Sequence, residues 1–373
     1  MLPRSQNELD HLLDREHTIR VEISPENPLP NNAAYADILP LAQTGFTFTP
    51  RQLLHAIGCK TAALPATAND ECIKAALLYT YILDLEGDHL SFQGDFGSDL
   101  QTARSQEIGI GFMCLLAQRY FDIPWDQLGS IPGQGKRFDY RGVAHGRDCI
   151  FEAKGTSYYN NQTAQIEHGI EKKNAIHQGG EHFDVELIVS TYIGRRNGAP
   201  RIILADPDKS SLKALFSRGD ERYYRLKHYC RVLQYIGLPQ SAYQLNRFTQ
   251  KYLNDRNALY QVILDEKSQT GFLTSVIVGD DVFLGRWFSD WLPDGSKRYK
   301  KLSLRSSSIS LKDRKNRIRV FQGVRRDIYR SLFTDKPFSQ NLLSRQAING
   351  YARTNQPRVS VFPDGTIMLF EQG

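Results

Sequence analysis

Three residues near the middle of the chain, Asp139, Glu152 and Lys154, have the types and the spacing of a hydrolytic site. Side chains two positions apart on a β-strand share a face, so Glu152 and Lys154 project together from the run CIFEAK at 149–154, with Ala153 between them. Charges at the end of such an apolar strand need partners, because burying an unpaired charge is costly. We therefore expect this carboxylate and this ammonium to belong to a site.

Asp139 lies on a short strand expected at 137–142, before a hairpin loop at 144–147. This loop places Asp139 opposite Glu152, whereas a slip of one residue would turn Asp139 to the other face. Two convergent carboxylates and a backbone carbonyl, that of Ala153, are hard oxygen ligands of the kind that hold Mg²⁺ or Mn²⁺. Such an ion polarises a phosphodiester and lowers the pKa of a bound water. Lys154 would position or deprotonate that water, or stabilise the charge that develops on phosphorus.

Around these residues the spacing of apolar side chains switches several times between the period of a helix and that of a strand. Apolar spacing predicts a helix at 105–121 that ends before Pro124, and two short strands at 137–142 and 149–154. It then predicts a polar helix at 163–177 and two β-rich runs at 184–192 and 201–205. The order helix, strand, strand, helix, strand, strand is typical of a mixed sheet flanked by helices. The expected fold class is therefore α/β or α+β.

The pattern D-x(12)-E-A-K on consecutive strands resembles the PD-(D/E)xK, or restriction-endonuclease-like, nuclease superfamily. The resemblance covers residues 98–206, and Phe138 stands where the family name has proline. It implies a helix-strand-strand-strand-helix-strand core, a divalent metal, and hydrolysis of DNA or, less often, RNA. It also implies an acidic residue on the first core helix, which Glu107 matches, and Gly111 one helical turn on would leave room for that carboxylate to reach the metal.

A simpler interpretation of the same residues is structural. Glu152 and Lys154 would then form a solvated surface ion pair, and Asp139 would be a turn residue. The metal site is favoured because an exposed strand would not normally read CIFEAKG.

Positive charge is concentrated near the C-terminus. Residues 296–330 hold thirteen Lys and Arg against two Asp, an excess larger than the net charge of +6 of the whole chain. A phosphate backbone is the natural counter-charge, although a solvated basic face or a surface for an anionic partner is the alternative. The residues expected to bind nucleic acid are Lys297, Arg298, Lys300, Lys301, Arg314, Lys315, Arg317 and Arg319. A basic helix at 222–231 either lines the same channel or is an ordinary exposed face.

Composition narrows the class of protein. The five cysteines are scattered without a C-x-x-C pair, which argues against a disulfide framework or a zinc knuckle and favours the cytoplasm. The N-terminus lacks the apolar core of a secretory signal, and no apolar run is long enough to span a membrane, so no membrane partner is expected. The expected divisions are an N-terminal accessory region (1–95), the nuclease core (96–210), a helical region (211–270) and a basic C-terminal α+β region (271–373).

Together these observations predict a Mg²⁺-dependent nuclease that acts on DNA in preference to RNA. The setting in which such nucleases commonly occur suggests an endonuclease of bacterial restriction or anti-phage defence, acting as a homodimer or with a partner protein of a defence complex. Two alternatives stay open. One is a non-catalytic nucleic-acid-binding or assembly protein on a nuclease-like fold, and the other is a secreted antibacterial nuclease toxin.

Overall fold

The computed structural model describes residues 6–61, 83–85, 87, 89–92, 98–131, 138–178, 183–194, 199–206, 221–254, 273–291, 317–332 and 359–372. Over these residues the chain forms eight helices, a mixed seven-stranded sheet, a five-stranded antiparallel sheet and a two-stranded ribbon. The expected mixture of helices and sheet is confirmed at this level.

The seven-stranded sheet contains the residues singled out in the sequence. Its order is β2-β1-β9-β8-β7-β6-β5. The strands are β1 (His17–Ile23), β2 (Phe46–Phe48), β5 (Gly129–Ser130), β6 (Tyr140–Ala144), β7 (Arg147–Thr156), β8 (Val185–Tyr192) and β9 (Arg201–Ala205). β7 pairs in parallel with β8 and antiparallel with β6, so it lies inside the sheet with neighbours on both sides.

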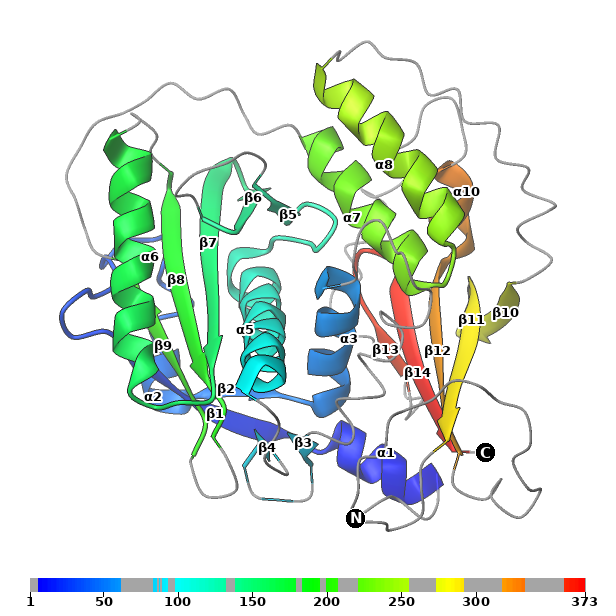
Figure 1. The fold of residues 1–373 in the computed structure, drawn as a ribbon, viewed down its shortest axis with the longest axis horizontal. Helices are drawn as coiled ribbons and strands as arrows, with labels where there is room; N and C mark the ends of the chain where they lie inside the picture. The colour runs from blue at the N-terminus through cyan, green and yellow to red at the C-terminus, as the bar shows by residue number, and fades with distance from the viewer. Residues whose placement is uncertain are drawn as a thin grey trace.

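Two long helices cover the two faces of this sheet. α5 (Ser98–Phe121) precedes the hairpin of β6 and β7, and α6 (Asn161–Gln178) forms the crossover from β7 to β8. Figure 1 shows α6 on one side of the sheet and α5 on the other, with α3 (Pro50–Thr61) outside α5. A parallel pair needs such a crossover, because the chain must return to the same end of the sheet before it enters the next strand.

The side chains of β7 point alternately to the two faces of the sheet, one covered by α5 and the other by α6. Cys149, Phe151 and Ala153 are buried in the main core, on the face that α5 covers. Ile150 points to the other face and packs with Ile188 in a smaller core beneath α6. The predicted orientation of this strand is confirmed, and Glu152 therefore lies on the face that α6 covers.

The contact between α5 and β7 is unusually close and depends on glycine. A Cβ on Gly155 would lie 1.7 Å from the carbonyl oxygen of Ser105, and a Cβ on Gly109 would lie 2.5 Å from that of Lys154. Backbone therefore meets backbone where β7 passes α5.

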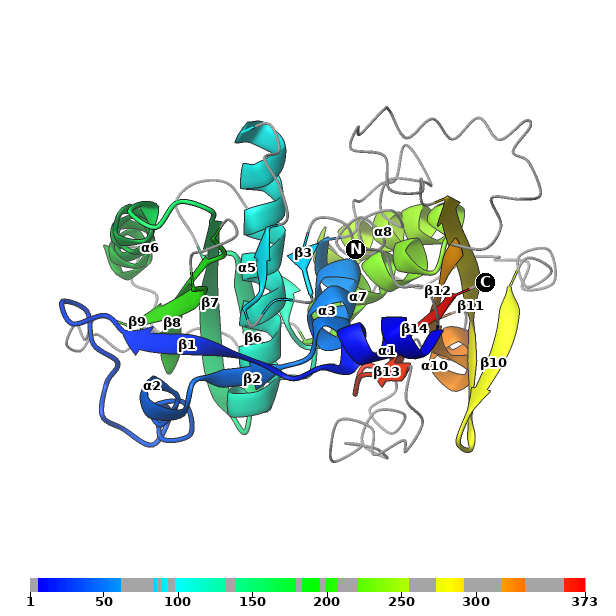
Figure 2. The ribbon, with the colours of Figure 1, turned by 90° about the horizontal axis from the view of Figure 1, so that it is seen from below.

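The second sheet is formed by the C-terminal part of the chain. Its order is β10-β11-β12-β14-β13, with β10 (Thr274–Val278), β11 (Asp281–Trp291), β12 (Arg317–Arg325), β13 (Val359–Val361) and β14 (Thr366–Gln372). α3, α7 (Glu221–Tyr235), α8 (Pro239–Asn254) and α10 (Arg326–Ser331) lie beside it, as Figures 1 and 2 show. The remaining elements are α1 (Gln6–Asp14), α2 (Leu41–Thr44), β3 (Leu83–Asp84) and β4 (Ser91–Phe92).

The N-terminal region, expected to be an accessory region, contributes to the main sheet. β1 pairs in parallel with β9, and β2 continues the sheet beyond β1 (Figure 2). One apolar core runs through the described residues from Leu9 in α1 to Phe370 in β14. The two sheets thus share a core that the expected boundaries do not divide. No helix of the described residues is long and apolar enough to cross a membrane.

Candidate active site

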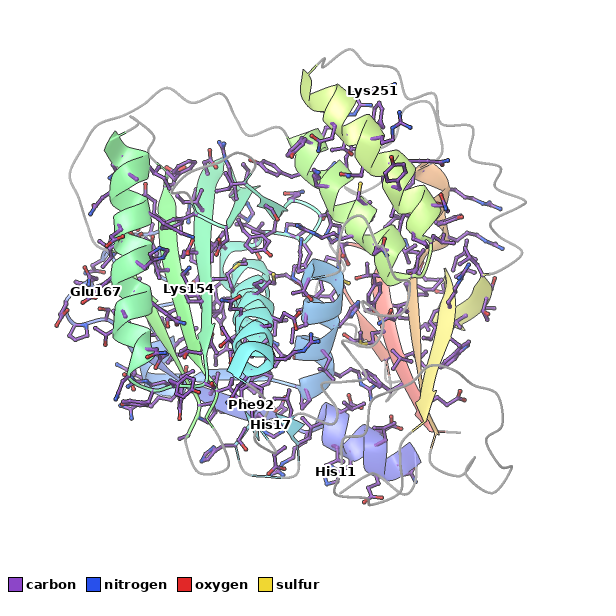
Figure 3. The ribbon with its side chains drawn as sticks, in the orientation of Figure 1. His11, His17, Phe92, Lys154, Glu167 and Lys251 are labelled. Carbon is purple, nitrogen blue, oxygen red and sulfur yellow. The ribbon has the colours of Figure 1, made fainter. Side chains whose placement is uncertain are left out.

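Strand β7 presents Glu152 and Lys154 on the same face, as the sequence predicts. The Glu152 side chain is 0% exposed, and its Oε1 lies 2.6 Å from Nζ of Lys154. The pair is therefore not a solvated surface ion pair, because its carboxylate is removed from water. Lys154 is labelled on β7 in Figure 3.

Asp139 reaches the same place from the end of the neighbouring strand. Tyr140 pairs with Phe151, so the next position brings Asp139 level with Glu152, in the predicted register. Asp139 itself is in a bend directly before β6, and its amide still donates to the Phe151 carbonyl at 3.1 Å. Its Oδ2 accepts the amide of Ala153 at 3.2 Å, which anchors the carboxylate beside Glu152.

The turn between β6 and β7 is tighter than the expected loop at 144–147. Ala144 and Arg147 still pair, so only His145 and Gly146 connect the strands. Their φ angles are 49° and 75°, and two consecutive positive φ angles are typical of the two-residue turns that match the twist of a hairpin. The shorter turn keeps the same register.

A fourth charged residue, which the sequence analysis did not select, joins the three. Nζ of Lys172, on α6, lies 2.6 Å from Oε1 of Glu152 and 3.4 Å from Oδ1 of Asp139. The ammonium thus bridges the two carboxylates. In the sequence Lys172 is one of several charges on a polar helix, and its distance of twenty residues from Glu152 offers no local signal.

Burial and charge together perturb the carboxyl group at the centre. Burial raises the pKa of Glu152 above its ordinary value of 4.5, the charge of Asp139 raises it further, and the ion pairs with Lys154 and Lys172 oppose both effects. For Lys172, burial acts to lower the pKa, but the hydrogen bonds and charges of Glu152 and Asp139 outweigh it and raise the pKa above 10.5. Lys172 is therefore a cation at neutral pH.

The donor set fits a small divalent cation. Oε2 of Glu152 is buried and has no hydrogen-bond partner among the described residues, so one oxygen of a dry carboxylate is left for a further ligand. The Lys172 ammonium occupies a position between two carboxylates, where a metal ion would make the same contacts with oxygen. Within the described part of the chain no group of three or more His, Cys, Asp or Glu side chains gathers as a metal site. Mg²⁺ would thus need the backbone or water for its other ligands, and the Ala153 carbonyl stays a predicted one.

Helix α6 is held in the orientation that brings Lys172 to the carboxylates. Gln165, seven positions earlier and so on the same side of the helix, donates to the Gly155 carbonyl at 3.1 Å and accepts the Ser190 hydroxyl at 2.9 Å. A Cβ on Gly169 would lie 2.9 Å from the Ile188 side chain, so the helix approaches the sheet closely.

The next residue of α6 forms a second buried polar cluster. Nζ of Lys173 contacts Oδ1 of Asp206 and lies 3.1 Å from Oε2 of Glu186. Glu186 also accepts a hydrogen bond from Nε2 of His177 at 2.7 Å, and the Tyr35 hydroxyl donates to Asp206. The consecutive lysines therefore tie α6 to two different carboxylate pairs on one face of the sheet.

The packing of α5 on β7 turns Glu107 away from that strand. Ser105 and Gly109 face β7, and Glu107 is about 200° around the helix from each of them. Its carboxylate pairs instead with Arg104, 2.5 Å away on the same helix. The space beside Gly111 is taken by Leu53 and Ile57 of α3. A role for Glu107 in metal binding stays a prediction, and this face of α5 does not support it.

Most of the basic residues expected to bind nucleic acid lie outside the described residues, namely Lys297, Arg298, Lys300, Lys301, Arg314 and Lys315. The backbone of Arg317 and Arg319 belongs to β12, opposite Trp291 and Ser289 of β11. On the basic helix α7, Arg225 pairs with Asp126 at 3.3 Å, and Arg231 donates to the Ser130 hydroxyl at 2.7 Å. These α7 residues have structural partners.

Comparison of the chain with known proteins identifies no relative. No family model matches the chain, and no match is found among the curated proteins or among the solved structures.

Proposed function

We infer that the chain is a Mg²⁺- or Mn²⁺-dependent nuclease that hydrolyses phosphodiester bonds at Asp139, Glu152 and Lys154. The observation that carries the proposal is the convergence of two carboxylates around the Lys172 ammonium, beside the buried middle of strand β7. Glu152 is fully buried there and keeps one oxygen without a partner among the described residues. Lys154 and Lys172 both contact Oε1, so Oε2 is the oxygen that is available to a metal ion.

Each residue has a separate task in the proposed reaction. Asp139 and Glu152 hold the ion, which when bound supplies positive charge to polarise the phosphodiester and to acidify water. Lys154 lies 2.6 Å from Glu152 and is 20% exposed, so its ammonium stands between the buried carboxylate and solvent. From there it orients the attacking water or stabilises the negative charge that develops on phosphorus.

The order of the surrounding elements supports a restriction-endonuclease-like core. Along the chain the order is α5, β5, β6, β7, α6 and β8, which is the helix-strand-strand-strand-helix-strand order that the resemblance implies. The first three of these strands pair antiparallel, and α6 leads to the parallel neighbour β8. In this proposal β1, β2 and β9 extend the core sheet.

The substrate is proposed from charge. The excess of Lys and Arg at 296–330 favours a nucleic-acid backbone, with DNA ahead of RNA. The proposed enzyme is an endonuclease of bacterial restriction or anti-phage defence. It would act in the cytoplasm, as a homodimer or with a defence partner. Binding that weakens steeply as salt is raised is the expected signature.

The test is metal-dependent cleavage of plasmid DNA, single-stranded DNA and RNA. Asp139→Ala and Lys154→Ala should each lower the rate by about a hundredfold or more, the scale expected for a group that acts in the transition state. Glu167→Gln is the matched control, because it neutralises an exposed carboxylate on α6 and should leave the rate unchanged (Glu167 is labelled in Figure 3). Cleavage that both alanine variants retain would overturn the assignment of the site.

A non-catalytic nucleic-acid-binding or assembly protein is the second candidate. It is favoured by one observation: the Lys172 ammonium bridges Asp139 and Glu152 and so provides these carboxylates with a cation from the chain itself. Salt-sensitive binding of nucleic acid, with no cleavage in Mg²⁺ or Mn²⁺, would select this candidate.

A further inference from the structure

We propose that Lys172 is a positioning residue of the site, whose ammonium occupies the cation position while the divalent ion is absent and competes with that ion for Asp139. The inference rests on the proposed function, because it takes Asp139 and Glu152 as the ligands. It concerns α6, a helix that the pattern D-x(12)-E-A-K does not include.

The oxygens of Asp139 show why the two cations exclude each other. Oδ2 accepts the Ala153 amide at 3.2 Å, and this bond holds the carboxylate in place. Oδ1 is then the oxygen that faces a cation, and Lys172 contacts it at 3.4 Å. An ion that bridges Asp139 and Glu152 would bind Oδ1 close to the ammonium, and the repulsion between the two cations at that distance favours departure of the ammonium.

The two contacts of Lys172 are unequal. Its Nζ lies 2.6 Å from Glu152, which is short even for a charged hydrogen bond, whereas 3.4 Å to Asp139 is beyond the usual N–H···O range. The weak contact is also on the more open side, because the Asp139 side chain is 36% exposed and that of Glu152 is 0% exposed. The Asp139 end is therefore where an ion enters.

Lys173 shows that a bridging lysine on α6 need not be displaceable. Its side chain is 5% exposed, and both of its carboxylate partners, Glu186 and Asp206, are 5% exposed as well. All three side chains of that bridge are therefore shielded from solvent. Lys172 differs from its neighbour in having one partly exposed partner, Asp139, and a carboxylate oxygen beside it, Oε2 of Glu152, with no partner among the described residues.

The experiment measures binding of Mn²⁺ and Mg²⁺ to the full chain by titration calorimetry, without nucleic acid. Lys172→Met removes the competing charge, so the dissociation constant for Mn²⁺ should fall at least tenfold below that of the wild type. Lys172→Arg keeps a cation and should stay within about threefold of the wild type. Lys251→Met removes an exposed charge on α8 and should change nothing (Lys251 is labelled in Figure 3). Urea unfolding of each variant verifies that it is folded.

A second measurement follows the side chain directly. Reductive methylation mapped by mass spectrometry should label Lys172 several-fold faster once Mg²⁺ is added, because the ammonium leaves its carboxylates. Equal Mn²⁺ affinities of wild type and Lys172→Met, or labelling that Mg²⁺ does not accelerate, would overturn the role of Lys172 and leave the metal site standing. If neither wild type nor Lys172→Met binds Mn²⁺ at millimolar concentration, the inference and the proposed metal site both fail.

Discussion

Replacing Gly155 by alanine should destabilise the protein more than any other change of one methyl group near the site. The added Cβ would lie 1.7 Å from the Ser105 carbonyl oxygen and 2.4 Å from its carbonyl carbon. Both atoms are backbone of α5, so no side-chain rotation relieves the overlap. The helix and the strand must separate, by roughly 1.5 Å if a normal contact of about 3.3 Å is to be restored.

The loss of stability can be derived from the packing that this separation disturbs. Overpacking a core costs about 1–3 kcal/mol when side chains and backbone adjust, and more when they do not. Phe151 of β7 and Phe112 of α5 are fully buried in the core that these two elements share, so separating the elements loosens that core. We therefore expect Gly155→Ala to lower the free energy of unfolding by about 3 kcal/mol or more.

The matched control is Gly146→Ala in the hairpin turn. No atom lies within 4 Å of a Cβ built there, so only the positive φ of 75° is penalised. Such a conformation costs an L-residue about 1–2 kcal/mol. Urea unfolding of both variants, compared at equal m-values, gives the two costs. If Gly155→Ala costs no more than Gly146→Ala, the close approach of α5 and β7 is not as described.

Two further predictions concern the buried polar groups outside the site. Burial lowers the pKa of His228 to about 4 and that of His55 to about 3, both below the ordinary 6.5. Below pH 6.5 these histidines bind more protons in the unfolded chain than in the folded one, so the contribution of His228 to stability should fall by about 3 kcal/mol as pH drops from 6.5 to 4, which urea unfolding of the wild type and His228→Gln at both pH values measures. Lys60 donates to two backbone carbonyls from a fully buried position, so Lys60→Met should cost about 1–3 kcal/mol or more, against less than about 0.5 for the exposed Lys251→Met.

Local patterns in the sequence were sufficient for the geometry of β7. Strand alternation has a period of two, so the run CIFEAK separates Phe151 and Ala153 from Glu152 and Lys154 without reference to the rest of the chain. The register with β6 was also predictable, because a short turn at His145 and Gly146 leaves few ways to pair the two strands. These local rules placed Asp139 beside Glu152.

The order of elements did not determine which helix face meets the site. The position of Glu107 on the helix before the hairpin predicts a role in the site, but the rotation of α5 is set by the close packing of Ser105 and Gly109 against β7. That contact turns Glu107 toward Arg104 instead. Helical position alone does not reveal such a rotation, since it depends on residues about fifty positions away in the chain.

The pairing of strands far apart in the chain was likewise not predictable from the sequence. β1 joins the sheet beside β9, with Arg20 level with Arg201, and no local pattern connects segments so far apart. Lys172 is the corresponding case in the site, because α6 must pack on β8 through Gly169 before its ammonium meets Asp139 and Glu152. The sequence by itself thus determined the two carboxylates and Lys154, through strand period and hairpin register. Only the tertiary structure decided which helix supplies the cation between them, because that depends on how whole elements pack.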